Sequence, residues 1–444
     1  MGLRNRQQRN LRPPRYGSPS NESKSKRGTA PKLWGIAAGT VAAVTVAGLS
    51  LSVINNSNSG ASGASKPTAR PSASTDSRGS VDGGVPVGFP HTESGARAAA
   101  ASFATVTGSS AVLTDKMARH RAISIMSTEV TASALAEEAD RAAGQALIEL
   151  RGDTKRLIRK QAIARTGVLS AQTVGFDFHK ATVRLWTTAV RGNTAGHMPP
   201  KASFQTMTVN LVWEHNDWKV AGNSSAKGPI APIDVRQATN AVADFSPYVP
   251  TGADDPVYTG ALGANGFPAP YAHNEQGARG AATSSVMLFG DPRFFVDARW
   301  RHAMLGATVA PSALGSITSD SDSTARLVTE NRGLGDDGKT PDGDPVVTRT
   351  AVLGSRFLSY SDQAASVEVW TASVGGIAGS DETQRPQVAY LRMVVDLTWV
   401  EGTWRATSVR PSEPLVPAPP TGEQAAPASG FADAGGVDNA PALA

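Results

Sequence analysis

The middle of the chain carries the same sequence pattern twice, and this duplication constrains the fold more than any other feature. Arg119-His120 recurs as Arg301-His302 at an offset of 182, VRLWTTAV recurs as VEVWTASV at 184, and VNLVWEHNDW recurs as VDLTWVEGTW at 186. A period this long exceeds that of solenoid repeats, so it predicts one domain present in two copies. Six of the eight tryptophans form three matched pairs, which we expect to mark the repeat cores: Trp186 with Trp370, Trp213 with Trp399, and Trp218 with Trp404.

Each copy begins with helical patterns and ends with strand patterns. Thr92 and Asn274 supply helix N-caps, each followed by Glu, ahead of Ala-rich segments. Alternating apolar residues in segments such as ATVRLWTTAV then predict antiparallel strands, and the W-x4-W ending predicts a tight hairpin. This order predicts an α+β fold, with helices packed on a curved antiparallel sheet in two duplicated cone-like domains. The second copy is rich in Gly and Asp over residues 319–345, which argues against a full third helix there.

The N-terminus is strongly basic, whereas the rest of the chain is slightly acidic. Positions 1–32 include one acid, Glu22, and nine basic side chains: Arg4, Arg6, Arg9, Arg12, Arg15, Lys24, Lys26, Arg27 and Lys32. The whole chain has a formal net charge of +5, so a tail of +8 leaves −3 for the remainder. A nucleic-acid-binding domain needs basic residues on a folded surface. We therefore expect no direct nucleic-acid contact from the folded domains.

A long uncharged segment comes after the basic tail. The 22 residues from Leu33 to Ile54 carry no charge, and a helix of that length spans about 33 Å, enough for a hydrocarbon core of about 30 Å. We therefore predict a single transmembrane helix in the cytoplasmic membrane. The positive-inside rule places the basic tail in the cytoplasm, facing partners or anionic lipid, and the C-terminal domains outside. Cleavage near Ala61–Ser65 and a buried core helix are the alternatives.

The predicted organisation has seven parts. The linker after the apolar segment is Ser/Gly-rich and is expected to be a flexible stalk. The parts are a basic cytoplasmic tail (1–32), a transmembrane helix (33–54), a linker (55–85), a first repeat domain (86–222), a connector (223–266), a second repeat domain (267–411) and a disordered Pro-rich tail (412–444).

The residue types offer little for metal or cofactor chemistry. The chain has no cysteine, which excludes Cys-ligated zinc, iron–sulfur clusters, thiol catalysis and disulfides. His91 and His120 have the same separation in the sequence as His273 and His302, but no third candidate ligand repeats with them. Zinc sites need three or four protein ligands. We therefore expect no metal site and no cofactor.

The segment GLGDDGKT, from Gly333 to Thr340, matches the P-loop pattern without its chemistry. Asp336 and Asp337 would oppose phosphate oxygens, and the Pro-containing sequence after the segment cannot begin a helix cleanly. A solvated acidic loop is the simpler interpretation, and Ca²⁺ binding by the Asp cluster is the alternative. The matched strands repeat no carboxylate that could act as a catalytic base. We predict a protein that is not an enzyme.

Helices followed by antiparallel strands that end in a W-x4-W hairpin resemble the nuclear-transport-factor-two-like fold. A basic tail, one membrane helix, a stalk and two such domains resemble the TcpC-type conjugation proteins of Gram-positive bacteria, bitopic scaffold components of type IV secretion channels. The resemblance covers Leu33 to about Pro411. It implies a non-enzymatic, membrane-anchored structural subunit that forms homo-oligomers and contacts other channel subunits or a transfer ATPase through extracytoplasmic domains. The alternatives are a membrane-tethered binding protein for a cell-wall polymer, small ligand or surface partner, and a ketosteroid-isomerase-like enzyme.

Overall fold

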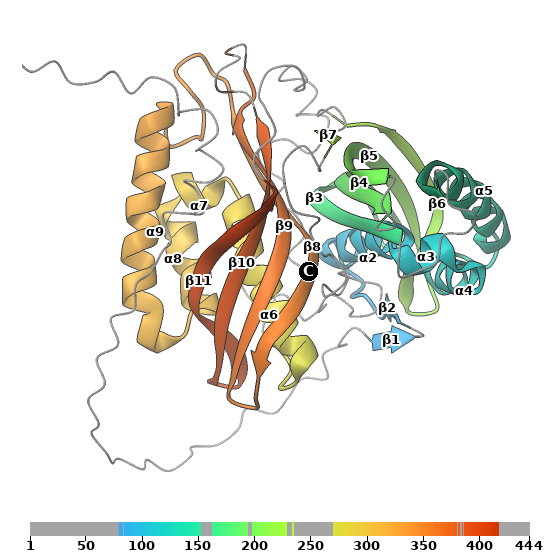
Figure 1. Ribbon diagram of the computed structural model, residues 1–444, viewed down its shortest axis with the longest axis horizontal. Helices are drawn as coiled ribbons and strands as arrows, with labels where there is room; N and C mark the ends of the chain where they lie inside the picture. The colour runs from blue at the N-terminus through green and yellow to red at the C-terminus, as the bar shows by residue number, and fades with distance from the viewer. Residues whose placement is uncertain are drawn as a thin grey trace, which may run out of the picture. The chain divides into compact units, whose positions relative to one another are not determined.

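The computed structural model describes residues 80–82, 84–151, 162–193, 198–228, 233–234, 270–379, 381, 384 and 386–416. Within these ranges each repeat folds into an α+β domain, which we call cone 1 and cone 2 (Figure 1). The α+β class predicted from the sequence is confirmed. The predicted basic tail (1–32), the apolar segment Leu33–Ile54 and the Pro-rich tail, apart from its first residues, lie outside the described residues.

Cone 1 has a short hairpin, a group of helices and then an antiparallel sheet. In chain order its elements are β1 (Ser80–Asp82), β2 (Val85–Val87), α2 (Glu93–Thr107), α3 (Ser110–Thr114), α4 (Lys116–Met126), α5 (Ala132–Arg151), β3 (Ala162–Phe176), β4 (Lys180–Asn193), β5 (Met198–Glu214), β6 (Asp217–Lys227) and β7 (Ile233–Asp234). The long strands pair in the order β3-β4-β5-β6, and β7 pairs with β5. Every neighbouring pair is antiparallel, as the alternating sequence pattern predicts.

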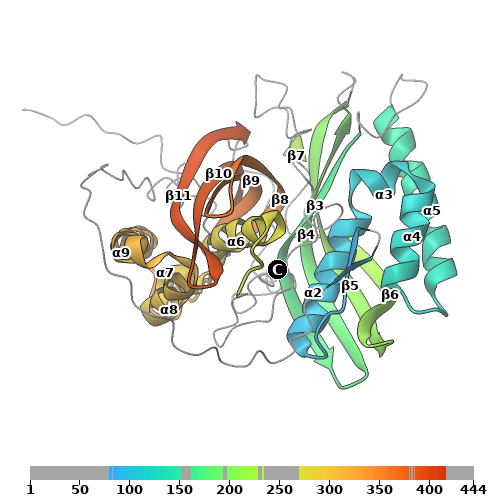
Figure 2. The same ribbon diagram turned by 90° about the horizontal axis from the view of Figure 1, so that it is seen from below.

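Cone 2 repeats the order of a group of helices and then an antiparallel sheet. Its elements are α6 (Glu275–Met287), the 3₁₀ turn η2 (Leu288–Gly290), α7 (Arg293–Val296), α8 (Ala298–Thr308), α9 (Pro311–Arg332), β8 (Val346–Tyr360), β9 (Ala364–Ile377), β10 (Gln387–Val400) and β11 (Thr403–Val416). The strands form a four-stranded antiparallel sheet in the order β11-β10-β9-β8. This sheet curves over α6, and α9 lies beyond α7 and α8 (Figures 1 and 2).

The helix starts and the final hairpins agree with the local sequence signals. The side chains of Thr92 and Asn274 accept hydrogen bonds from backbone N–H groups of the first turns of α2 and α6. In the β5–β6 hairpin Trp213 pairs with Trp218, and the two turn residues between the strands have positive φ. Glu401, with φ 53°, begins the equivalent turn of cone 2. Two-residue turns with positive φ at both positions match the twist of the flanking strands.

The prediction that cone 2 lacks a full third helix is wrong. Helix α9 has 22 residues, with a proline in its first turn and Gly333 at its end in the left-handed conformation, φ 62°. Ile317, Thr324 and Val328 are buried at near-helical spacing along one face. This buried stripe stabilises the helix despite its Ser and Asp content, because the charged side chains of Arg326 and Glu330 lie on the exposed faces. The Gly/Asp-rich sequence disrupts the helix only after Gly333.

The predicted fold class needs one further correction. It included a single transmembrane helix, which the described residues do not show. No helix in the described ranges is long and apolar enough to cross a membrane. The longest described helices, α5 and α9, both carry charged side chains along their exposed faces. The segment Leu33–Ile54, on which the prediction rested, lies outside the described residues.

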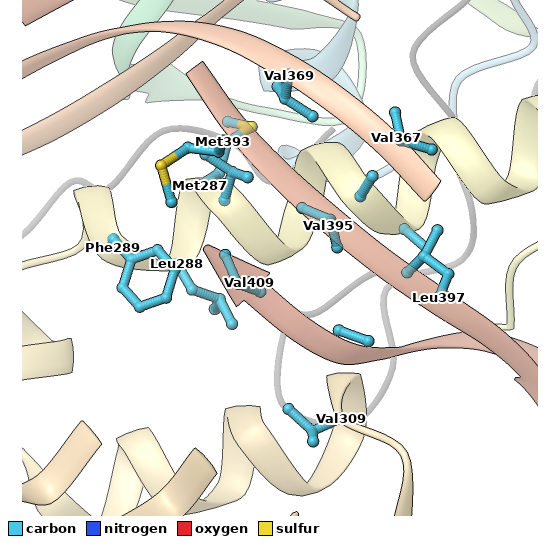
Figure 3. Close-up of a cluster of buried hydrophobic side chains, with 14 of the residues drawn as sticks. Met287, Leu288, Phe289, Val309, Val367, Val369, Met393, Val395, Leu397 and Val409 are labelled. Carbon is cyan, nitrogen blue, oxygen red and sulfur yellow. The ribbon is translucent and has the colours of Figure 1, made fainter. Parts of the chain in front are cut away.

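Each cone has its own apolar core between its helices and the inner face of its sheet. In cone 2, Met287 from the end of α6 and Val395 and Leu397 from β10 point into this space (Figure 3). In cone 1, Val183 from β4 and Leu211 from β5 occupy the corresponding core. Because side chains alternate along a strand, only every second residue of each strand faces its own helices.

A glycine after the first helix allows that helix to approach the sheet closely in both cones. A Cβ atom on Gly108 would lie 1.9 Å from Thr166 Oγ1, and a Cβ atom on Gly290 would lie 2.3 Å from the Thr350 backbone nitrogen. These distances are shorter than any van der Waals contact. The two glycines are related by the repeat offset of 182, so the close approach belongs to the repeated fold.

Candidate functional site

Two of the three matched tryptophan pairs lie within the cones. Trp218 and Trp404 are buried in the cores of cone 1 and cone 2. Trp213 and Trp399, on the adjacent strands, are partly buried and pack against those cores. In each cone the two indole rings meet edge to face, with centroids 5.3 Å apart in cone 1 and 5.6 Å apart in cone 2.

The third pair, Trp186 and Trp370, lies between the two sheets. These residues are 2% and 0% exposed and belong to a cluster distinct from either cone core. Leu185 contributes to the cone 1 core, whereas the next residue, Trp186, contributes to this other cluster. We call the cluster the sheet-to-sheet interface. Its residues are Ile163, Leu169, Trp186, Val190, Ala202 and Phe204 from cone 1, and Val347, Ala351, Leu353, Trp370, Ala372, Val374, Ala378, Val388 and Tyr390 from cone 2.

A histidine stacks on a hairpin tryptophan in each cone. The rings of His91 and Trp213 have centroids 3.9 Å apart and an interplanar angle of 8°. The equivalent rings of His273 and Trp399 are also 3.9 Å apart, at 10°. His91 Nε2 forms a hydrogen bond of 2.5 Å with the backbone oxygen of Phe178. These contacts fix the start of the first helix against the strand hairpins.

The tip of the first strand hairpin differs between the cones. In cone 1 the side chains of Val174 and Phe178 are 52% and 73% exposed. At the equivalent positions, with an offset of 184, cone 2 has Leu358 and Asp362. The cone 1 tip is therefore the more apolar of the two, although the backbone arrangement is the same.

A buried arginine ties three helices of cone 1 together. Arg119 on α4 donates from Nη1 to the Val112 carbonyl oxygen on α3 at 2.7 Å. It also donates from Nε to Oδ1 of Asp140 on α5 at 2.7 Å. His120 Nε2 and Lys116 Nζ lie 2.9 Å and 3.1 Å from Asp140 Oδ2. We call this group the cone 1 clamp.

Cone 2 contains the same arrangement, which we call the cone 2 clamp. Arg301, 4% exposed, donates to the Phe294 carbonyl oxygen at 2.7 Å. It also donates to Asp322 Oδ1 on α9, from Nε at 2.9 Å and from Nη2 at 2.6 Å. His302 Nε2 lies 2.9 Å from the same oxygen. Ala298 stands where cone 1 has its lysine, so the cone 2 clamp has one cation fewer.

These contacts lower the pKa of both aspartates. For Asp140 the hydrogen bond with His120 is the largest cause of the lowered pKa, and it outweighs the opposing effect of burial. For Asp322 burial alone would raise the pKa, but the hydrogen bonds from Arg301 and His302 more than offset it, and the pKa is lowered. Both carboxylates are therefore ionised at neutral pH and joined to cations within their own cone.

The two aspartates are the site residues that sequence reasoning missed. Asp140 and Asp322 are also related by the offset of 182, so the expectation that no third residue repeats with the histidines is wrong. The repeat offset itself was the signal that could have found them. The two histidines of a cone are not brought together, because His91 stacks on Trp213 while His120 contacts Asp140. Across the described ranges, no group of three or more His, Cys, Asp or Glu side chains could hold a metal ion.

The P-loop-like segment from Gly333 to Thr340 connects α9 to β8. A helix precedes it and a strand comes after it, the reverse of the strand–loop–helix order that presents helical amides to phosphate. Asp337 Oδ1 accepts a hydrogen bond from the Lys339 backbone N–H at 3.1 Å. Gly338, with φ 71°, completes this local turn. The geometry is that of a connecting loop.

An open groove of about 690 Å³ runs along α3 and α4 of cone 1. Its lining combines apolar side chains such as Val85 and Met117 with the polar residues Asp115, His120 and Arg121. The groove lies on the helical layer, whereas the space between α2 and the sheet is filled by the cone 1 core. The groove is a place on the helical layer of cone 1 where a small ligand could bind.

No protein-family model matches the chain, and no curated protein sequence does. Among solved structures the chain is similar to one titled "Ntf2 like protein involved in plasmid conjugation", with 8% sequence identity and a TM-score of 0.17. The match covers 72% of this chain and 97% of the other. It is a loose resemblance that carries no argument at this TM-score and does not show a TcpC-type protein. The function of the chain therefore has to be inferred from its own residues and geometry.

Proposed function

We propose that the chain is a non-enzymatic structural subunit of a conjugation or type IV secretion-like apparatus, in which the two cones serve as assembly surfaces. The observation that carries the structural part of this proposal is that the interior of each cone is filled with apolar side chains. Ligand-binding cavities combine an enclosed volume with a few polar groups that orient the ligand. In the part of the chain that the structure describes, buried apolar side chains of the protein's own core occupy the space between the helices and the sheet of each cone.

The filling residues come from the strands and are fully buried. Each is at most 2% exposed, and they are Val183, Leu211 and Trp218 in cone 1 and Val395, Leu397 and Trp404 in cone 2. A core packed in this way gives each cone a fixed shape, because tightly packed interiors resist deformation. Fixed shape is the property that an assembly subunit needs.

The repeated ionisable side chains also serve the architecture. The Arg–His–Asp groups lie in the helical layers, where each aspartate joins α4 to α5 or α8 to α9. A catalytic acid or base must reach a substrate atom within hydrogen-bond distance, and the buried Arg119 and Arg301 are not placed to do so, although His120 lines the groove of cone 1. Their duplication in both cones is explained by their role in holding the helices of each repeat.

The link to conjugation comes from the sequence, in the order of a basic tail, an apolar segment, a stalk and two repeats. The solved structure whose title names plasmid conjugation is too dissimilar to add weight. Under this proposal the partners are further copies of the chain, other channel subunits or a transfer ATPase. The alternative function as a small-ligand receptor has less support, because buried apolar side chains of the described residues occupy the interior of each cone.

Crosslinking in the native cells followed by mass spectrometry tests the proposal. We expect channel components or a transfer ATPase to be recovered with the chain, and we expect its deletion to abolish transfer in a mating assay. Recovery of the chain alone, as a monomer, together with normal transfer after deletion, would overturn the assignment to a transfer apparatus.

A second measurement separates a structural role from catalysis. His120→Gln and His302→Gln keep a side-chain donor for the clamp aspartates but cannot titrate near neutral pH. We expect the double variant to support normal transfer with an unchanged melting temperature. Loss of transfer at an unchanged melting temperature would show that the imidazoles do chemistry and would contradict the structural proposal.

A further inference from the structure

The open groove on α3 and α4 of cone 1 lies where cone 2 has a stack of large side chains. In cone 2 the guanidinium of Arg293 lies over the ring of Trp300, 4.4 Å from its centroid. Arg293 also donates from Nη2 to Asp291 Oδ2 at 2.6 Å. The equivalent positions of cone 1, at the offset of 182, carry small side chains that line the groove, namely Ser109, Ala111 and Ala118. The groove is therefore the place where cone 2 has an indole ring and a guanidinium.

The β3–β4 hairpin tip of cone 1 also differs from its counterpart. Val174 and Phe176 lie two residues apart on β3, so they share a face, and they are 52% and 41% exposed. Phe178, in the turn, is 73% exposed, and its ring meets His91 only edge to face. Cone 2 has Asp362 at the position of Phe178. A group of exposed apolar side chains that includes an aromatic ring is typical of a surface that contacts another protein.

The groove and the tip each carry one acid and one base next to their apolar residues. In the groove these are Asp115 and Arg121, and at the tip they are Asp177 and Lys180, which are both exposed. Asp177 Oδ1 accepts hydrogen bonds of 2.7 Å from the backbone N–H groups of His179 and Lys180, which hold the carboxylate at the turn. The two surfaces can therefore pair opposite charges, Asp177 with Arg121 and Lys180 with Asp115.

We propose that the β3–β4 hairpin tip of cone 1 docks into the α3–α4 groove of a second copy of the chain. The phenyl ring of Phe178 then occupies in the groove the place that the indole ring of Trp300 has in cone 2. The inference rests on the proposed function for its role in the cell, and it deepens that function by naming one contact between copies.

The geometry of this contact determines the kind of assembly. The tip and the groove are two different surfaces of the same cone, so the contact is head-to-tail and joins copies into rings or open chains. One hairpin tip in one groove is a small contact beside the about 800 Å² per partner of a standard interface. Self-association through it should therefore be weak and should rise with protein concentration.

Sedimentation velocity of the purified full-length chain, over a range of concentrations, tests the proposal. Phe178→Asp gives the tip the residue of cone 2, and Ala118→Trp gives the groove the residue of cone 2. Each change should weaken self-association about tenfold or more, as expected when a buried phenyl ring is lost from a contact. The melting temperature should stay the same. Association through other parts of the chain is common to all variants and does not affect the comparison.

Mixing the two variants distinguishes a head-to-tail contact from a general loss of association. The Phe178→Asp chain keeps an intact groove, and the Ala118→Trp chain keeps an intact tip. An equimolar mixture should therefore form one-to-one dimers at concentrations at which each variant alone stays monomeric. Larger species should not form, because the dimer has no further intact pair of surfaces.

Matched variants keep the result interpretable. Leu358→Asp changes an exposed residue of the cone 2 tip, 50% exposed, and should leave self-association unchanged. Ser124→Trp blocks the groove from an exposed position and replaces Ala118→Trp if that variant folds poorly.

The chain has no cysteine, so introduced cysteines can report the contact directly. Under a mild oxidant, His179→Cys at the tip of one chain should form a disulfide with Met117→Cys at the groove of a differently tagged chain. Gln363→Cys, the equivalent of His179 in cone 2, should not. The proposal is overturned if the tip and groove variants associate like wild type, or if their mixture forms no more dimer than either alone. If the contact forms but crosslinking in cells recovers no channel component, the proposed function fails and the contact stands.

Discussion

Replacing Trp186 with alanine should uncouple the two cones while leaving each cone core complete. The side chain is 2% exposed, and its neighbours in the sheet-to-sheet interface come from both sheets. It contributes to neither the cone 1 nor the cone 2 core. Trp218→Ala is the matched change, because that indole is equally buried but lies inside cone 1.

The size of the effect depends on the burial of the indole. Truncation of a fully buried tryptophan to alanine costs about 3–5 kcal/mol in free energy of unfolding. For units of about 150–250 residues, 1 kcal/mol shifts the melting temperature by about 2–4 °C, so the total shift is about 6–20 °C. For Trp186→Ala the lost free energy is that of the contact between the two sheets, and the free energy of each cone core is unchanged. We therefore expect two separate unfolding transitions where wild type has one.

Differential scanning calorimetry and urea unfolding followed by circular dichroism measure both quantities. Trp218→Ala should lose stability of similar size, but within cone 1 and with the interface intact, so the protein should still unfold in a single transition, at a lower midpoint. The reasoning would be refuted by a Trp186→Ala protein that melts in a single transition within about 2 °C of wild type, less than the shift expected for 1 kcal/mol. It would also be refuted if the two variants had superimposable unfolding profiles.

Three further predictions concern a clamp, the interface tyrosine and two glycines. Folding lowers the pKa of Asp322, so the carboxylate stabilises the folded protein above the unfolded pKa of about 3.9, and this stabilisation is lost as pH falls through the lower folded pKa. In Asp322→Asn the melting temperature should therefore fall less steeply as the pH is lowered. Burial raises the pKa of Tyr390, so the neutral phenol stabilises the folded protein below the unfolded pKa of about 10, and this stabilisation is lost as pH rises through the folded pKa. Because Phe cannot ionise, Tyr390→Phe should unfold at a higher pH than wild type. In urea titrations Gly290→Ala should destabilise by about 1–3 kcal/mol, because its Cβ atom would lie 2.3 Å from a backbone nitrogen. Gly144→Ala, within α5 and with no atom within 4 Å of the new Cβ, should stabilise by about 0.5–1 kcal/mol.

Each of these predictions has an outcome that contradicts it. An acid profile of Asp322→Asn identical in shape to wild type would mean that the clamp carboxylate contributes nothing to acid stability. A Tyr390→Phe protein that unfolds at the same alkaline pH as wild type would show that this phenol is not the titrating group. If Gly290→Ala and Gly144→Ala changed stability in the same direction, the close approach of η2 to β8 would not be the cause.

The duplication allowed the architecture of each repeat to be predicted, because the repeat offset aligns local signals that are weak individually. Caps at Thr92 and Asn274 and the two W-x4-W hairpins depend on a few neighbouring residues, and short-range chemistry fixes them. The Gly/Asp-rich composition did not predict the full length of α9, because composition does not show the spacing of its buried residues. Its buried residues recur at helical intervals, and burial of that face overrides the poor intrinsic propensity of Ser and Asp.

The position of Trp186 shows where sequence reasoning stops. Period-two alternation shows that Leu185 and Trp186 point to opposite faces of β4, but both are apolar, so the pattern does not say which face meets the helices. Both faces are buried, one by the cone's own helices and the other by the second sheet. A strand that is buried on both faces is apolar on both faces, whether helices or another sheet cover it. The sequence therefore did not predict that the second sheet packs on the outer face, and only the structure shows it.

The pairing of the sheets also determines which surfaces remain for other partners. Once the outer faces cover each other, the helical layers and the hairpin tips are the surfaces of the two described cones that remain for contacts with further proteins. The two repeats have diverged there, with Phe178 exposed in cone 1 where cone 2 has Asp362, and Lys116 in cone 1 where cone 2 has Ala298. At the interface, by contrast, six pairs of equivalent positions are apolar or aromatic in both copies. The two domains are therefore similar where they meet and different at their hairpin tips. Because the tips differ in charge and apolar character, we expect different partners to contact the two cones.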